Sequence, residues 1–143
     1  MTTMARKTYP QTPHGIGYAA SCYMLAGKLD SADRLIQELA TKDRYYAAQI
    51  LFYIGHPVAD AGDDKSAGQI MDLVLKYWPN NYMALYHAGM SAYVLGEYPK
   101  AEEQLQEFLR IYQPNDGWKN KAKLALSRIE QDIPADKRFS QHH

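Results

Sequence analysis

A spacing of 34 to 35 residues recurs along this 143-residue chain, and it limits the possible folds more than any other feature of the sequence. The first shift is 35 residues and the second is 34. The extra residue falls between Leu39 and Gly55, and we place it in a turn near residues 41–45. The aligned rows are Ala20, Gly55 and Gly89; Gly27, Gly62 and Gly96; Ala32, Ala67 and Ala101; and Ile36, Met71 and Leu105. A period of this length indicates similar two-element units that stack side by side.

Local signals within each unit predict a helical hairpin. The glycines at 27, 62 and 96 stand where a helix must stop and the chain must reverse, which favours a residue that can adopt positive φ. Polar residues that can cap the next helix follow them, and Pro99 suits a first helical turn. The candidate caps are Asp30, Asp63 and Asp64. The small residues of the first row should face Ala32, Ala67 and Ala101, so that the two helices of a hairpin approach closely.

We therefore predict an all-α chain with seven helices. Their expected ranges are 13–26, 31–41, 43–60, 64–78, 81–95, 99–112 and 117–131. Pro57 falls inside the third of them. Because proline removes a hydrogen bond and clashes one turn back, we expect a kink or an early end near Ile54.

The pattern of glycines, small residues and large apolar residues resembles the tetratricopeptide repeat. The third unit resembles it best, through Leu85, Ala88-Gly89, Gly96, Tyr98, Ala101, Leu105, Phe108 and Pro114. The resemblance implies a right-handed α-solenoid of three helical hairpins with a C-terminal capping helix. The expected organisation is a domain at 13–132, with repeats at about 13–42, 43–79 and 81–114 and a cap at 117–131. Flexible tails are expected at 1–12 and 133–143.

Charge and composition limit the classes of partner. The chain has 16 Lys plus Arg and 16 Asp plus Glu, so no overall field draws it to nucleic acid or to an anionic membrane. No apolar run approaches the roughly 20 residues that span a bilayer. The single cysteine, Cys22, fits a reducing compartment, and no signal peptide is evident. We expect a cytoplasmic protein without nucleic-acid or membrane partners.

The sequence contains no recognisable catalytic, cofactor or metal motif. Nucleophile elbow, phosphate loop and dinucleotide patterns are absent, and the Asp60–Asp64 stretch lacks the spacing of a calcium loop. Cys22 is expected to be buried or half-buried, and His56 and His87 are expected to stand alone. We therefore predict a protein that is not an enzyme and needs no cofactor or metal.

The resemblance implies that the first helix of each hairpin lines a concave groove that binds a segment of another protein, as in an adaptor, scaffold or small chaperone. Helical spacing then gives the lining as Met24, Leu25, Gln49, Phe52, His56, Met83, Tyr86, Met90 and Tyr93. Self-assembly into a homo-oligomer is the alternative. The aromatic residues that would support it are Tyr45, Tyr46, Tyr53, Tyr77, Trp78 and Tyr112.

Overall fold

The computed structural model describes residues 9–132, and this part of the chain is all-α, as predicted. It contains seven α-helices and one short 3-10 helix. They are α2 (Pro13–Leu25), α3 (Leu29–Gln37), η1 (Thr41–Asp43), α4 (Arg44–Asp60), α5 (Asp64–Tyr77), α6 (Tyr82–Val94), α7 (Tyr98–Ile111) and α8 (Gly117–Asp132). Residues 1–8 and 133–143, which make up most of the predicted tails, lie outside the described part.

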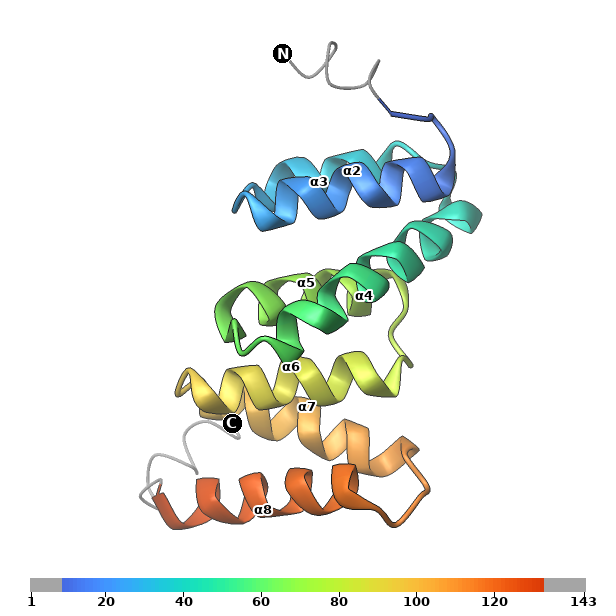
Figure 1. The fold of residues 1–143 in the computed structure, drawn as a ribbon. Coiled ribbons are helices and arrows are strands. Elements are labelled where there is room, and N and C mark those ends of the chain that lie inside the picture. Colours follow the sequence, from blue (N-terminus) through green and yellow to red (C-terminus); the bar gives the residue numbers. More distant parts are fainter. Residues whose placement is uncertain (1–8, 133–143) are drawn as a thin grey trace.

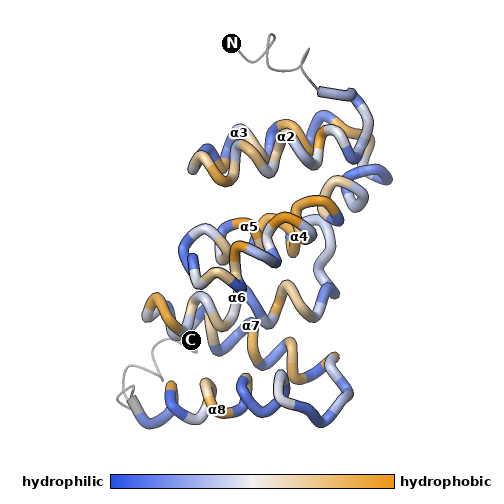
Figure 2. Tube along the Cα trace, in the orientation of Figure 1, coloured by the Kyte–Doolittle hydropathy of each residue, from blue (hydrophilic) through white to orange (hydrophobic). Residues whose placement is uncertain are grey.

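The helices stack in chain order along one direction (Figure 1). The pairs α2/α3, α4/α5 and α6/α7 form hairpins, and α8 packs against α6 and α7 at the far end of the stack. Packing between consecutive helices is compatible with a helical repeat. Hydrophobic residues are distributed along all the hairpins rather than gathered in one helix (Figure 2). The buried residues of the described part accordingly form three clusters that extend along the stack.

The three predicted glycine turns are confirmed. Gly27, Gly62 and Gly96 have φ values of 79°, 85° and 80°, in the left-handed region that a side chain disfavours. The backbone N–H of Lys28 donates to the carbonyl of Tyr23. Asp63 donates to Val58 and Glu97 to Ala92 in the equivalent bonds of the other two turns, so a carbonyl is satisfied at each helix end. The same local device therefore closes every hairpin.

Two of the predicted caps need adjustment. The Asp63 carboxylate accepts the backbone N–H of Ser66 and caps α5, as predicted. Asp30 does not cap α3, because the helix begins at Leu29 and Asp30 lies in its first turn. Asp64 lies inside α5, where it bonds to Ser91 of α6.

Gly55 and Gly89 of the first row allow close approach of the two helices of their hairpins. A methyl group at Gly55 would lie 2.7 Å from Cγ2 of Ile70, and one at Gly89 would lie 2.8 Å from Cδ2 of Leu105. The nearest neighbours of Gly55 are therefore Ile70 and Met71 of α5, and the nearest neighbour of Gly89 is Leu105 of α7. All of these partners are fully buried.

One helix boundary differs from the predicted range by several residues, and Pro57 does not end its helix. The helix predicted at 31–41 ends at Gln37, and the separate 3-10 turn η1 occupies the place where the repeat accepts its extra residue. Of the kink or early end expected near Ile54, the early end does not occur, because α4 continues past Pro57 to Asp60. Pro57 lies on an exposed face in the last turn, so the Tyr53 carbonyl that it leaves without a helical partner lies close to solvent.

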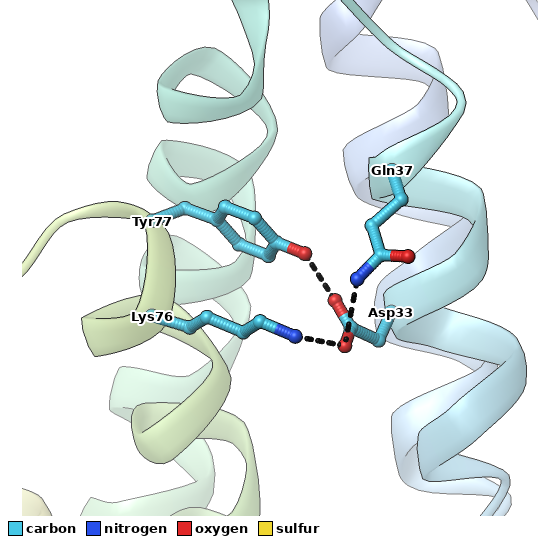
Figure 3. Close-up of polar contacts among 4 residues, drawn as sticks. All are labelled: Asp33, Gln37, Lys76 and Tyr77. Carbon is cyan, nitrogen blue, oxygen red and sulfur yellow. Dashed lines mark hydrogen bonds and ion pairs between the residues drawn. The ribbon is translucent and has the colours of Figure 1, made fainter. Parts of the chain in front are cut away.

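The first hairpin docks on the second differently from the way the second docks on the third. Helix α6 packs extensively on α5, whereas α4 contacts α2 much more than α3. A polar bridge joins α3 to α5 instead: the Asp33 carboxylate accepts from Lys76 and from the Tyr77 hydroxyl, as Figure 3 shows. Lys76 and Tyr77 lie 43 and 44 residues after Asp33 in the chain. In the bridge between α5 and α7, Lys100 lies only 28 residues after Asp72. The second helices of successive hairpins therefore meet at different registers.

Candidate partner-binding surface

The first helices of the three hairpins carry almost no charge. In α2, α4 and α6, Arg44 and Asp60 are the only Asp, Glu, Lys or Arg residues, and α2 and α6 contain none. Arg44 is occupied, because its guanidinium donates to the carbonyls of Leu39 and Gln37. The charges of the described part lie instead on α3, α5, α7, α8 and the turns.

These uncharged helices nevertheless expose large apolar side chains. Tyr53 of α4 is 68% exposed, Val94 of α6 is 62% exposed and Leu25 of α2 is 52% exposed. Tyr45 and Tyr46 are also exposed at the start of α4. In a helix whose exposed face only meets water, charged residues normally occupy such positions. The combination of exposure and missing charge makes these helices the candidate interaction surface.

The nine predicted groove residues divide into three groups. Leu25 is exposed, and six are half-buried and still accessible: Gln49, Phe52, His56, Met83, Met90 and Tyr93. Met24 and Tyr86 are buried, so the prediction that they line the groove is corrected. Met24 packs into the core of the first two hairpins, and Tyr86 packs against Phe108 and Trp118.

Two histidines that were expected to stand alone meet at the junction of the second and third hairpins. The ring centroids of His56 and His87 are 4.8 Å apart in an edge-to-face arrangement. Nδ1 of His56 lies 3.3 Å from the Asp60 carboxylate, one helical turn further along α4. The position of Asp60 at i+4 from His56 is a sequence signal that could have predicted this contact.

The environment of His87 favours its neutral form. Burial lowers the pKa of His87, and the positive charge that His56 gains on protonation lowers it further, whereas the Asp60 carboxylate acts in the opposite direction. Its Nε2 atom is buried without a hydrogen-bond partner. Protonation would therefore place an unpaired cation beside a second imidazole.

Trp118 of α8, which was assigned only to the capping helix, belongs to this junction. Its ring lies 5.0 Å from that of Tyr86 and 6.2 Å from that of His87, measured between centroids. The Lys121 ammonium lies 5.7 Å from the Trp118 ring centroid. Ring contacts continue from His56 through Phe52 and Trp78 to Tyr45, so aromatic side chains run from the start of α4 to α8.

The aromatic residues proposed for self-assembly are not one continuous exposed patch. Tyr45, Tyr46 and Tyr53 of α4 are exposed. Tyr77, Trp78 and Tyr112 are half-buried, and the hydroxyls of Tyr77 and Tyr112 donate to Asp33 and Asp116. Cys22 is exposed on α2, which corrects the expectation of a buried or half-buried thiol.

Between residues 9 and 132, no three His, Cys, Asp or Glu side chains are grouped so that they could hold a metal ion. No helix of that region is both long enough and apolar enough to cross a membrane. Among known proteins, no family model matches the chain, and no curated protein matches it significantly.

Proposed function

We propose that this chain is a helical-repeat protein of the tetratricopeptide type that binds a segment of another polypeptide in a groove along α2, α4 and α6. In this proposal the three hairpins form a right-handed solenoid and α8 is its cap. The protein acts as an adaptor, scaffold or small chaperone and catalyses no reaction.

One observation carries the proposal: the first helices combine exposed apolar side chains with an almost complete lack of charge. Methionine and aromatic side chains adapt to apolar partners of varied shape, and Met83, Met90 and Phe52 supply them here. An uncharged surface offers no counter-ion to phosphates or to a cluster of carboxylates. The partner is therefore a segment with regularly spaced apolar side chains and few charges.

The proposal is tested by selecting peptides from a displayed random library on the full chain. The selected peptides should be rich in apolar residues. The variant Met90→Lys should bind a selected peptide at least ~10-fold more weakly, because a desolvated lysine in the groove would lack a partner. Affinity is measured by fluorescence anisotropy with the peptide labelled.

The matched control is Glu103→Lys, which adds a lysine at an exposed position on the second helix of the same hairpin. Its affinity should stay within about twofold of the wild type, as for a substitution remote from the contact. Equal weakening by both variants, or no effect of Met90→Lys, would contradict a groove on the first helices.

A further inference from the structure

One residue of the proposed groove can change its charge near neutral pH. Of the nine predicted lining residues, only His56 has a side chain that titrates between pH 5 and 8, because the others are leucine, methionine, glutamine, phenylalanine and tyrosine. The His56 side chain is 38% exposed, so water reaches it. The repeat aligns His56 with Met90 of α6, and both residues are half-buried. An almost uncharged surface therefore contains one group that becomes cationic in mild acid.

The two imidazoles at the junction of the second and third hairpins differ in how well each can carry a positive charge. Nδ1 of His56 lies 3.3 Å from the exposed carboxylate of Asp60, which can accept a hydrogen bond from the protonated ring. The ring of His87 lies 4.8 Å from that of His56, between centroids, but it is buried and its Nε2 atom has no hydrogen-bond partner. A proton that binds at this junction is therefore held by His56.

Among the described residues, Asp60 is the only Asp, Glu, Lys or Arg within ion-pair distance of His56. Helix α2 contains no such residue, and α6 contributes only the ring of His87. Within residues 9–132, no ion pair or hydrogen bond joins His56 to α3, α5 or α8. Lys121 of α8 lies over the ring of Trp118 instead. The protonated state of His56 therefore has one partner, and that partner is on the same helix.

We propose that His56 makes partner binding in the groove depend on pH, so that the partner is bound at neutral pH and released in mild acid. This inference rests on the proposed function, because it concerns the regulation of the same groove. A partner that packs on Phe52, whose ring centroid is 5.8 Å from that of His56, removes water from the imidazole. Loss of water disfavours the charged form of the ring, so binding is less favourable when His56 is protonated.

The sign of the effect depends on the chemistry of the partner. Before an apolar segment can bind, protonated His56 must release its proton or lose its water, so the affinity falls as the pH falls through the range in which an imidazole titrates. A partner that placed a carboxylate beside His56 would bind more tightly in acid, because it would pair with the cation. The lack of other charges along α2, α4 and α6 favours the apolar segment.

The experiment measures the affinity of the full chain for a labelled peptide at pH 7.5 and at pH 5.5. The peptide is one selected on the full chain at pH 7.5, with blocked ends and without His, Asp or Glu, so that only the protein titrates. The wild type should bind it at least ~5-fold more weakly at pH 5.5, since histidine titrates in this range. The affinity of His56→Gln, whose amide stays neutral, should differ by less than about twofold between the two pH values.

The matched control is His14→Gln, which removes an exposed histidine at the start of α2 that is not among the predicted lining residues. This variant should keep the full pH dependence of the wild type. Circular dichroism at pH 5.5 checks that the helices of each protein remain folded. A loss of affinity in acid that His56→Gln shares would come from unfolding or from another group, and it would overturn the proposal. Tighter binding of the peptide in acid would overturn it as well.

The groove and its dependence on pH can fail separately. If the full chain binds no selected peptide at pH 7.5, the proposed function is wrong, and its regulation by His56 is wrong with it. If Met90→Lys weakens binding at pH 7.5 but the wild type binds equally well at both pH values, the groove stands and only the role of His56 is overturned.

Discussion

His87 is a buried titratable side chain, and its surroundings make the stability of the protein depend on pH. Its ring contacts those of His56, Tyr86 and Trp118, and its Nε2 atom lacks a hydrogen bond. The other charged groups near this junction are Asp60 on α4 and Lys121 on α8. Burial is the main cause of the lowered pKa, and the effect of His56 is second.

The sign of the effect follows from proton binding. In the unfolded chain a histidine titrates near pH 6.5, and the pKa of folded His87 lies below that value. Between the two pKa values the unfolded chain binds more protons, so the free energy of unfolding falls as the pH falls through this window. The His87→Gln variant should therefore lose less stability than the wild type between pH 7.5 and 5, as measured by urea unfolding.

The difference between the two proteins isolates the contribution of this residue, because the other titrating groups are common to both. The acid loss that disappears in His87→Gln reports how far the pKa of folded His87 lies below that of the unfolded chain. His56→Gln should also reduce the acid loss, but by less, since it removes the second cause alone. Identical acid losses in wild type and His87→Gln would mean that His87 does not titrate abnormally.

At the scale of single residues, the sequence predicts features that a residue and its chain neighbours determine. Gly27, Gly62 and Gly96 needed positive φ because a helix stops there, and the repeat alone identified them. The contact between His56 and His87 was missed for a different reason. By the repeat, His56 aligns with Met90, not His87, and the angle at which α4 crosses α6 decides which side chains meet.

At the scale of elements, helix α3 packs less extensively on the rest of the stack than α5, α6 and α7 do. It has nine residues and few contacts with α4, whereas α6 packs extensively on both of its neighbours. Its contacts beyond α2 include polar ones as well as the buried core that Ala32, Leu35 and Ile36 share with the second hairpin. Asp33 joins it to Lys76 and Tyr77 (Figure 3). Arg44 donates to carbonyls at its C-terminal end. The bonds to Asp33 raise the pKa of Lys76 and contribute, after burial, to the raised pKa of Tyr77.

Hydrogen exchange should therefore show α3 opening before α5, α6 and α7. Partly exposed ion pairs contribute modestly, so Asp33→Ala should destabilise α3 by about 1 kcal/mol, which is roughly a fivefold faster exchange of its amides. Exchange in α6 should not change. The measurement is mass spectrometry of peptic fragments after labelling for seconds to hours.

The matched control is Asp30→Ala, an exposed acid in the first turn of the same helix that does not bridge to α5. It should weaken only the favourable interaction with the helix dipole, worth some tenths of a kcal/mol. If Asp30→Ala accelerates exchange in α3 as much as Asp33→Ala, the bridge does not hold this helix in place.

The existence of every helix was predictable, but the docking of α3 was not. Apolar spacing and glycine turns are local signals, so they predicted seven helices with small errors at the ends. The extra residue of the first shift was also visible, and η1 lies in the turn where it was placed. The effect of this residue on packing was not predictable from the sequence. A changed connection alters how two hairpins pack, and their packing depends on contacts between residues about 43 positions apart.

At the scale of the whole molecule, the distribution of charge matters more than its sum. The chain has as many acidic as basic residues, so its net charge predicts no preferred partner. The helices divide into two classes instead: α2, α4 and α6 are almost uncharged, whereas α3, α5, α7 and α8 carry the ions. The sequence contains this division, but the exposed fractions were needed to show that uncharged side chains such as Tyr53 and Val94 remain open to solvent.

This division makes a prediction about salt. If a partner binds along α2, α4 and α6, few ions are released, and the affinity for a selected peptide should change by less than about threefold between 50 and 500 mM NaCl. Phosphate-binding surfaces behave differently: a protein with 6–10 phosphate contacts loses about 10³–10⁵ in affinity over a smaller range. Isothermal titration calorimetry at three salt concentrations measures the slope. A steep loss of affinity would instead place the contact on the cations of α8, such as Lys121 and Arg128, and would exclude the uncharged helices as the binding surface.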